Sequence, residues 1–264
     1  MEKNGKVLLV MVDGMRPDSL TESGEGFLQS LLPQSTFSLD ARSVMPSLTL
    51  PCHASIFYGV SPERHGITDN TWHPFARPLE GVYETVHSAG KKTAAFIVWE
   101  HLRDLGRPGS LDHMEFTRMT KPYTNMIEQE ARLAKAAASY IQEEEPDFVF
   151  FYIGSTDECG HRCGWMSPEY LGCISAAQTC LRKLAASLPK QYSIIVTADH
   201  GGHGLHHGSD DILDMRVPML YYGPAFEKGV EITNASILDI APTVAAVLGL
   251  EANEEWVGVS RKKQ

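Results

Sequence analysis

Long apolar runs are missing from this sequence of 264 residues. A membrane-spanning helix needs about 18 or more consecutive apolar residues, and the run KVLLVMV at 6–12 is far shorter. The N-terminus also lacks the basic segment followed by an apolar segment that marks a secretory signal. We therefore expect no contact with a membrane and no signal peptide.

Cysteine is scarce and positive charge is in deficit. Five cysteines, an odd number with no C-x-x-C spacing, argue against a disulfide framework and a dithiol redox function. We expect reduced thiols and a cytoplasmic location. With 23 basic and 33 acidic residues, the formal net charge is −10, which argues against binding of a polynucleotide backbone. Something other than the overall charge would have to attract an anionic ligand, and bound cations would serve.

Short apolar runs alternate with amphipathic segments along the chain. Runs rich in β-branched and aromatic residues predict buried strands at 6–12, 92–98, 147–153, 192–198 and 217–223. Apolar residues at helical spacing predict helices at 79–89, 124–144, 168–187 and 236–248. Strands interleaved with helices predict an α/β fold, with a mainly parallel central sheet sandwiched by helices.

No internal repeat and no low-complexity linker divides the sequence. We therefore expect a single domain over residues 1–264. The least regular region is 99–123, and we consider 70–125 as a small cap or lid over the site. A plain surface excursion is the alternative for this region.

Asp13, Asp157 and Asp199 each follow one of the predicted strands. Ligands of open α/β sheets collect beyond the carboxyl ends of the strands, so we expect these side chains to meet there. A single aspartate after a strand is often a helix N-cap or a turn residue. Three carboxylates at one edge would repel one another and raise each other's pKa. The joint pattern favours a site for divalent cations.

Histidines accompany these aspartates. The stretch VTADHGGHGLHHGSDD at 196–211 holds four histidines and three aspartates, and His161 lies four residues after Asp157. Mixed carboxylate and imidazole ligands suit Zn²⁺, with Mn²⁺ or Fe as alternatives, whereas Ca²⁺ and Mg²⁺ prefer oxygen ligands alone. The pattern predicts a metal site at the carboxyl edge of the strands.

A hydroxyl group lies close to the expected site. The stretch SVMPSLTLPCH at 43–53 contains Ser47 and Thr49, just ahead of CHASIFYG, which predicts a short helix at 52–59. A hydroxyl ahead of a helix is often an ordinary N-cap. The same position also favours anion binding, and a nearby cation can hold an alkoxide there.

Four motifs in this order resemble the alkaline phosphatase superfamily, and in particular its type I phosphodiesterase / nucleotide pyrophosphatase branch. They are VMVDGMRPD, PSLTLPCHASIFYGVSPERHGITDN, STDECGH and TADHGGHG…HHG, and the resemblance extends over residues 7–226. It implies the superfamily fold, a dinuclear metal site at the carboxyl edge of the strands, and hydrolysis of phosphate esters.

The resemblance implies a role for each matching residue. Thr49 matches the nucleophile that becomes transiently phosphorylated. Asn70 matches an amide donor to a phosphoryl oxygen. Asp13, Asp199 and His200, together with the Thr49 oxygen, resemble the ligands of the metal that activates the nucleophile.

Asp157, His161 and His207 resemble the ligands of a second metal, which binds the leaving group. His207 is preferred to His206 because a glycine follows it, and His203 and His206 are expected beside the site or in solvent. Two metals about 3.5–4 Å apart can clamp the attacking and departing oxygens of an in-line displacement.

The sequence departs from the family pattern at Cys52, where the branch commonly has asparagine. Cys159 and Cys163 flank His161 and are either extra ligands or, as we favour, not ligands. The sequence is short for the branch, so the resemblance supports the chemistry more strongly than it supports specificity for nucleotides.

We therefore expect a Zn²⁺-dependent phosphodiesterase or nucleotide pyrophosphatase that acts on a small-molecule phosphate ester through a Thr49 phosphoenzyme. The alternatives within the superfamily are a phosphomonoesterase, a phosphonate hydrolase and a cofactor-independent phosphomutase. A sulfatase is disfavoured, because those relatives need C-x-P-x-R where this chain has TLPCH. The non-enzyme alternative is a catalytically silent metal or phosphate-ester binding protein.

Overall fold

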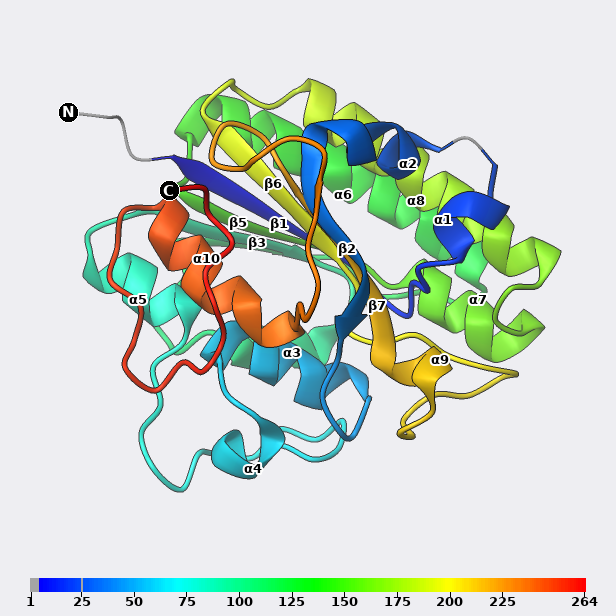
Figure 1. Ribbon diagram of the computed structural model, residues 1–264, viewed down its shortest axis with the longest axis horizontal. Helices are drawn as coiled ribbons and strands as arrows, with labels where there is room; N and C mark the ends of the chain where they lie inside the picture. The colour runs from blue at the N-terminus through cyan, green and yellow to red at the C-terminus, as the bar shows by residue number, and fades with distance from the viewer. Residues whose placement is uncertain (1–4, 25) are drawn as a thin grey trace.

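The computed structural model describes residues 5–24 and 26–264. It shows one twisted sheet between two layers of helices (Figure 1). The strands of the described residues form one sheet in the order β4-β3-β5-β1-β6-β7-β2-β8. Their bounds are β1 (Lys6–Val12), β2 (Ser35–Arg42), β3 (Thr93–Ile97), β4 (His113–Phe116), β5 (Phe148–Ile153), β6 (Tyr192–Thr197), β7 (Arg216–Tyr222) and β8 (Val230–Glu231).

The sheet is mainly parallel, as predicted. β1 pairs in parallel with β5 and β6, and β3 pairs in parallel with β5 and β4. β7 pairs antiparallel with both β6 and β2, so within the described sheet it alone runs in the opposite direction. The parallel part brings the carboxyl ends of β5, β1 and β6 next to one another.

The five predicted strands are confirmed to within one residue at each end. The central strands are buried on both faces, with every residue of β3, β5 and β6 buried. Such strands form nearly continuous apolar runs, which is why the sequence reveals them. β2, β4 and β8 were not predicted, because β2 mixes buried, partly buried and exposed residues and the other two are short.

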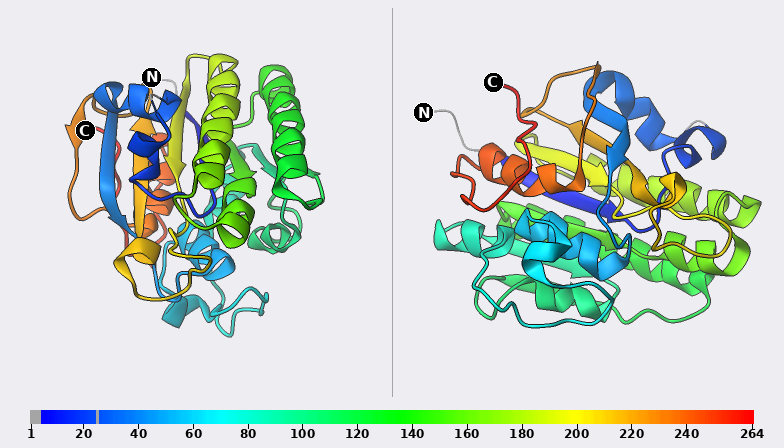
Figure 2. Two further views of the ribbon diagram at one scale, coloured as in Figure 1. Left: turned by 90° about the vertical axis from the view of Figure 1, so that its right-hand side faces the viewer. Right: turned by 60° about the horizontal axis from the view of Figure 1, so that its bottom comes forward.

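Helices cover both faces of the sheet (Figures 1 and 2). One layer holds α1, α2, α6, α7 and α8, and the other holds α3, α4, α5 and α10. The helix bounds are α1 (Ser19–Glu22), α2 (Phe27–Leu31), α3 (Thr49–Tyr58), α4 (Pro62–His65), α5 (Val82–Ser88), α6 (Tyr123–Glu144), α7 (Ser155–Cys163), α8 (Pro168–Ala186), α9 (Ile212–Met215) and α10 (Ile240–Val247). Short 3₁₀ helices are η1 (Leu32–Gln34), η2 (Glu100–Leu105) and η3 (Ile237–Asp239).

The predicted helices at 124–144 and 168–187 are confirmed by α6 and α8. The segment predicted at 79–89 is helical only in α5, since the carboxylate of Glu84 accepts the Gly81 N–H at 3.0 Å and fixes the start. The segment predicted at 236–248 divides into η3 and α10. Within the two described ranges, no helix combines the length and the apolar character that a bilayer-spanning helix needs.

The region expected as a cap or lid, 70–125, contributes α5, β3, η2, β4 and the start of α6. β3 and β4 belong to the central sheet, so the interpretation of 99–123 as a plain surface excursion is wrong for the residues of β4. A lid stays a prediction for the remaining segments, such as 70–81, which lies outside the sheet.

Candidate active site

The adjacent carboxyl ends of β5, β1 and β6 bring the three predicted aspartates to one edge of the sheet. Asp13 follows β1 directly, Asp199 lies just beyond β6, and Asp157 lies in the first turn of α7, which begins after β5. Asp13 and Asp199 are buried. The aspartates meet as expected, and their roles as metal ligands stay a prediction.

Asp13, Thr49, Asp199 and His200 form what we call the inner group. His200 Nε2 lies 3.3 Å from Asp13 Oδ1 and 3.4 Å from Asp199 Oδ2. Thr49 Oγ1 lies 3.3 Å from the same nitrogen. The side chains of Asp199 and His200 are 0% exposed. Asp13, Thr49 and Asp199 therefore surround the buried Nε2 atom of His200, the fourth residue predicted for the first metal.

Asp157, His161 and His207 form the outer group, and their candidate ligand atoms lie within 4.8 Å of one another. Asp157 and His161 are four residues apart on α7, so they share one helix face. The side chains are more exposed than those of the inner group, at 37% for His161 and 18% for Asp157. The two groups adjoin, because the His200 and His207 rings stack with centroids 3.7 Å apart.

Each aspartate offers one oxygen without a donor. Among the described residues, the buried carboxylate oxygens without a hydrogen-bond partner are Asp13 Oδ1, Asp157 Oδ1 and Asp199 Oδ2. The second oxygen of Asp13 accepts from the Tyr152 hydroxyl, and that of Asp199 accepts from the Gly14 N–H at 3.3 Å. Because buried carboxylate oxygens are costly without a donor or a cation, this arrangement fits divalent metal ions.

The three histidines of the inner and outer groups share one hydrogen-bonding pattern. Nδ1 of His161, His200 and His207 lies 2.8 Å from a backbone carbonyl oxygen in each case. A carbonyl can only accept, so Nδ1 carries the proton and Nε2 presents a lone pair. His161 Nε2 and His207 Nε2 face each other at 3.2 Å. A cation between them would remove the repulsion, and a carbonyl partner on the other nitrogen is typical of metal-binding histidines.

Burial controls the charge of this cluster. Burial and the charges of Asp199 and Asp157 raise the pKa of Asp13 well above its ordinary value. Burial and the charge of Asp199 likewise raise the pKa of Asp157. Burial, with the nearby His200, lowers the pKa of His207 to about 3, so this ring stays neutral near pH 7. Burial opposes ionisation of Asp199, yet His200 and His53 together hold the pKa of this carboxyl below its ordinary value. Carboxylates gathered in this way fit a site that takes up positive charge.

Thr49 is the first residue of α3, three residues earlier than the start predicted for this helix. The N-cap residue is Leu48, which makes no side-chain capping bond, so the interpretation of Thr49 as an ordinary N-cap is wrong. Its hydroxyl faces His200 instead and lies at the positive end of the helix dipole. Ser47, the other hydroxyl considered, donates to the Ser209 carbonyl at 2.7 Å.

Asn70 reaches the same helix N-terminus. Its Oδ1 accepts the Leu50 N–H at 2.9 Å, and Leu50 follows Thr49 directly. Since the oxygen is held by α3, the Nδ2 end of the amide is the one available to donate. This orientation suits the predicted role of Asn70 as a donor to a phosphoryl oxygen.

Two buried residues of the site were not predicted from the sequence. His53 lies one turn after Thr49 on α3, and its Nδ1 is 2.8 Å from the Thr49 carbonyl and 3.4 Å from Asp199 Oδ2. Tyr152, near the end of β5, donates its hydroxyl to Asp13. The i, i+4 spacing from Thr49 to His53 is a signal that could have revealed the first, and a buried tyrosine near a strand end could have revealed the second.

The loop after β6 is organised by Asp214, which is fully buried. Its carboxylate accepts from His203 Nδ1 at 2.7 Å, from the Ser209 hydroxyl at 2.7 Å and from the Ser209 N–H at 3.0 Å. His203 is thus bound to the loop and is partly exposed, and His206 is exposed to solvent as expected. The hydrogen bonds of this carboxylate to His203 and Ser209 hold the loop that carries His200 and His207.

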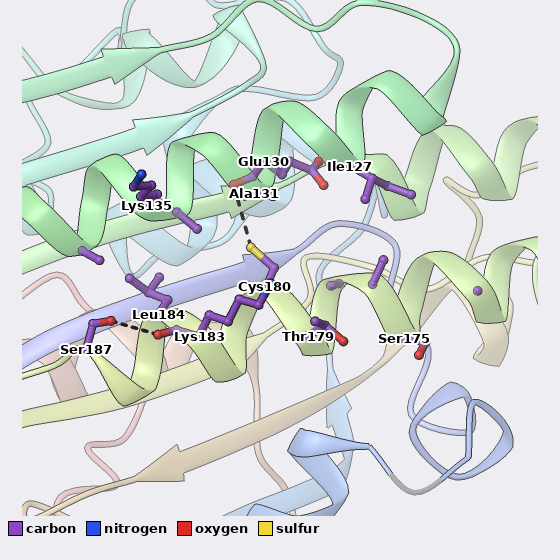
Figure 3. A pocket seen from close by; sticks show the side chains of 15 residues that line it. Ile127, Glu130, Ala131, Lys135, Ser175, Thr179, Cys180, Lys183, Leu184 and Ser187 are labelled. Carbon is purple, nitrogen blue, oxygen red and sulfur yellow. Dashed lines mark hydrogen bonds between the residues drawn. The ribbon is translucent and has the colours of Figure 1, made fainter.

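Figure 3 looks into a groove of about 670 Å³ between α6 and α8. Glu130 lies along it, and its buried carboxylate accepts the N–H groups of Gly154 and Ser155 at 2.9 and 2.8 Å. The Ser155 hydroxyl donates to the same carboxylate at 2.6 Å. Burial raises the pKa of Glu130 to about 7. Glu130 therefore fastens the start of α7, the helix that carries two residues of the outer group.

The cysteines take no part in the two groups. Cys52 is buried beside the Ser43 hydroxyl, and burial raises the pKa of its thiol. Within the described ranges, the candidate ligand atoms form two clusters, one of Asp157, His161 and His207 and one of Asp13, Asp157 and His200. Cys159 and Cys163 belong to neither cluster. Cys173 and Cys180 lie on α8 and are buried.

The aromatic side chains of the region 70–125 are only partly gathered. Trp72 and Phe75 pack with ring centroids 5.3 Å apart, and Phe75 lies 4.6 Å from the Tyr58 ring. These three rings line a cavity of about 390 Å³. Trp99 instead packs against His101, at 4.7 Å between ring centroids.

Known structures share this fold. Murine ectonucleotide pyrophosphatase / phosphodiesterase 5 in complex with AMP superposes with a TM-score of 0.79 over 94% of this chain and 96% of that chain, at 17% identity. The phosphonate monoester hydrolase of Agrobacterium radiobacter gives a TM-score of 0.75 over 97% and 76%, at 15% identity. At these identities the similarity establishes an alkaline-phosphatase-like architecture. The chemistry has to be argued from the residues of the site.

Curated relatives match in sequence. A venom phosphodiesterase of Macrovipera lebetinus is 27% identical over 224 residues, which cover 74% of this chain and 25% of that protein. Ectonucleotide pyrophosphatase/phosphodiesterase family member 7 of Homo sapiens is 23% identical over 252 residues, covering 83% and 55%. The chain thus spans about a quarter to about half of these relatives. The family model for type I phosphodiesterase / nucleotide pyrophosphatase matches residues 7–220, so the chain belongs to that family.

Proposed function

We propose that this protein is a metal-dependent hydrolase of small-molecule phosphate esters, with Thr49 as its nucleophile and diesters as its preferred substrates. The observation that carries the proposal is the position of the Thr49 hydroxyl. It lies at the N-terminus of α3, 3.3 Å from His200 Nε2. The same nitrogen lies 3.3 Å from Asp13 Oδ1 and 3.4 Å from Asp199 Oδ2, two carboxylate oxygens without donors. Membership of a family whose named relatives are phosphodiesterases and pyrophosphatases supports the same chemistry.

The inner and outer groups would each hold one divalent cation. Nitrogen and oxygen donors together suit Zn²⁺, with Mn²⁺ or Fe as alternatives. When bound, such ions lower the pKa of a coordinated hydroxyl and offset the negative charge of a phosphoryl group.

The chain itself positions the reacting groups. The Thr49 hydroxyl gives up its proton as its oxygen attacks phosphorus and forms a threonyl phosphate ester. The bond from phosphorus to the leaving oxygen breaks in line with the attack, and that oxygen takes up a proton as the alcohol departs. The dipole of α3 stabilises negative charge at this point. Asn70 donates from Nδ2 to a phosphoryl oxygen, because its Oδ1 is held by the Leu50 N–H. Hydrolysis of the threonyl ester by water then restores Thr49.

We expect a preference for diesters because the proposed donor, the side-chain amide of Asn70, is uncharged. Near neutral pH a phosphate diester carries one negative charge and a monoester carries nearly two. Asn70 offers a neutral amide to the phosphoryl oxygens, which matches the smaller charge of the diester. The relatives named as phosphodiesterases support this choice.

Hydrolysis of bis-p-nitrophenyl phosphate and of p-nitrophenyl phosphate tests the proposal. Both rates are measured on protein of known metal content, with and without added Zn²⁺. We expect faster turnover of the diester, with two ions bound per chain. A monoester preference would indicate a phosphatase or a mutase. The absence of turnover of either ester with both ions bound would contradict the proposal and favour a silent binding protein.

A further inference from the structure

Trp165 joins three segments that carry proposed metal ligands. It follows α7 and is buried, with 7% of its surface exposed. Its indole Nε1–H donates to the Gly14 carbonyl at 2.9 Å, and Gly14 is the neighbour of Asp13 in the chain. Its backbone N–H donates to the Gly204 carbonyl, also at 2.9 Å, in the loop after β6. One residue therefore ties α7, the end of β1 and this loop together.

The indole also contacts both histidines of the outer group. The centroid of the His161 ring lies 5.1 Å from that of Trp165, with the planes at 87°. The His207 ring lies at 5.8 Å and 64°. These edge-to-face contacts restrict the position of two imidazoles whose Nε2 atoms are only 3.2 Å apart.

Two glycines form the slot that receives the indole. A Cβ atom on Gly160 would lie 2.6 Å from the Trp165 ring, and one on Gly202 would lie 2.2 Å from it. Both distances are well below van der Waals contact, so any side chain at either position would displace the ring. Gly160 belongs to α7 and Gly202 to the loop after β6, which means that the ring fits between the two elements that carry the outer group.

We propose that Trp165 is a positioning residue for the outer group, and that it fixes the separation of His161 and His207 at a value that binds the outer ion. The inference rests on the proposed function, since it requires the outer group to hold a metal. Trp165 reaches the inner group through the backbone carbonyl of Gly14, whereas its ring contacts two side chains of the outer group, so the inner group should depend on it less.

The test is the Zn²⁺ affinity of Trp165→Phe, measured by competition with a chromophoric chelator. Loss of a residue that orients metal ligands typically weakens binding about 10- to 100-fold. We expect such a loss for the outer ion, with the inner ion bound as in the wild type. The Zn²⁺ concentration that gives half-maximal hydrolysis of the diester should rise by the same factor.

Trp256→Phe is the matched control. Trp256 is 8% exposed, donates from Nε1 to the Glu80 carbonyl at 3.2 Å, and packs against Gly59, where a Cβ atom would lie 2.5 Å from the ring. It thus fills a similar slot away from the proposed ligands. We expect this variant to lose thermal stability and to bind both ions with unchanged affinity.

Gly160→Ala tests the same inference with the tryptophan intact. Alanine favours the helical state of α7 by about 1 kcal/mol over glycine, yet its Cβ would displace the indole. We expect weaker binding of the outer ion despite the better helix former.

Outer-ion affinity equal to that of the wild type in both Trp165→Phe and Gly160→Ala would overturn the inference and leave the proposed function intact. An equal loss of affinity in Trp256→Phe would also overturn it, because a general loss of stability would then explain the effect. If wild-type protein bound fewer than two ions, both the inference and the proposed function would be wrong.

Discussion

The inner and outer groups differ in what holds them. The inner group lies at strand ends and at the start of α3, and its Asp199 and His200 side chains are 0% exposed. The outer group lies on α7 and on the loop after β6, and the His161 side chain is 37% exposed. The sheet fixes the first group directly, whereas the second depends on contacts between a helix and a loop.

This difference shows where substitutions distant from the metals should matter. Glu130 fastens the start of α7, Asp214 fixes the loop after β6, and Trp165 joins the two. Glu130 and Asp214 affect the outer group through the position of its backbone, and Trp165 also contacts its two imidazole rings. We therefore expect the outer group to be the more easily perturbed of the two.

The largest effect is expected inside the inner group. Thr49→Ala removes the proposed nucleophile, so turnover of the diester should fall by at least about a thousandfold. Both ions should remain bound, since the carboxylates and imidazoles are unchanged. Steady-state kinetics and metal analysis check this, with Thr49→Ser as the control that keeps a hydroxyl. Near-normal activity in Thr49→Ala would rule out the phosphoenzyme.

A change in the outer group should separate the two sites. His161→Gln removes one outer ligand, so we expect the loss of one ion and a fall in turnover of about a hundredfold or more. Asp199→Asn, its counterpart in the inner group, should prevent binding of the inner ion instead. Metal content measured by mass spectrometry distinguishes the two results. The loss of both ions in His161→Gln would show that the two groups are not separable.

Some residues of the two groups could be predicted from the sequence alone, and others could not. Asp13 and Asp199 could be predicted because they directly follow continuous apolar runs that form buried parallel strands. The assignment of His207 to the outer group required the family resemblance, since three other histidines share its loop.

The supporting residues could not be predicted, because they depend on contacts between distant segments. Glu130 lies on a helix whose pattern explains it as an ordinary polar position, yet it binds Ser155 across 25 residues of sequence. Trp165 contacts Gly14 across 151 residues. β2 was missed for a related reason, since its mixed pattern is weak without knowledge of its partner β7.

A smaller effect concerns the stability of the contacts that hold α7. Burial raises the pKa of Glu130 from an ordinary value of 4.5 to about 7. The folded state thus binds this proton more tightly than the unfolded state. The resulting stability is fully present below pH 4.5 and is lost as the pH rises through about 7, a change of about 3 kcal/mol.

The side chain in Glu130→Gln cannot ionise, so this variant should not lose stability in this way as the pH rises. Urea unfolding at pH 5 and pH 8 therefore should show the variant gaining stability relative to the wild type at the higher pH. The amide oxygen can still accept the Gly154 and Ser155 N–H groups, so the fold of α7 is retained. A difference in unfolding free energy that is the same at both pH values would contradict the raised pKa.

The smallest effect is expected at Cys163, which is partly exposed on α7 near His161. Cys163→Ser should leave metal content and diester turnover unchanged, because the thiol lies outside the outer group. A drop in outer-ion affinity would identify the cysteine as a ligand and would enlarge that group.

Zinc add-back to chelator-treated protein tests the central claim most directly. Turnover of bis-p-nitrophenyl phosphate is followed as Zn²⁺ is added up to two equivalents per chain. We predict that the buried inner group fills first with little activity, and that turnover rises with the second equivalent. Full turnover in metal-free protein, or turnover that is complete after one equivalent, would contradict a hydrolase that needs both groups.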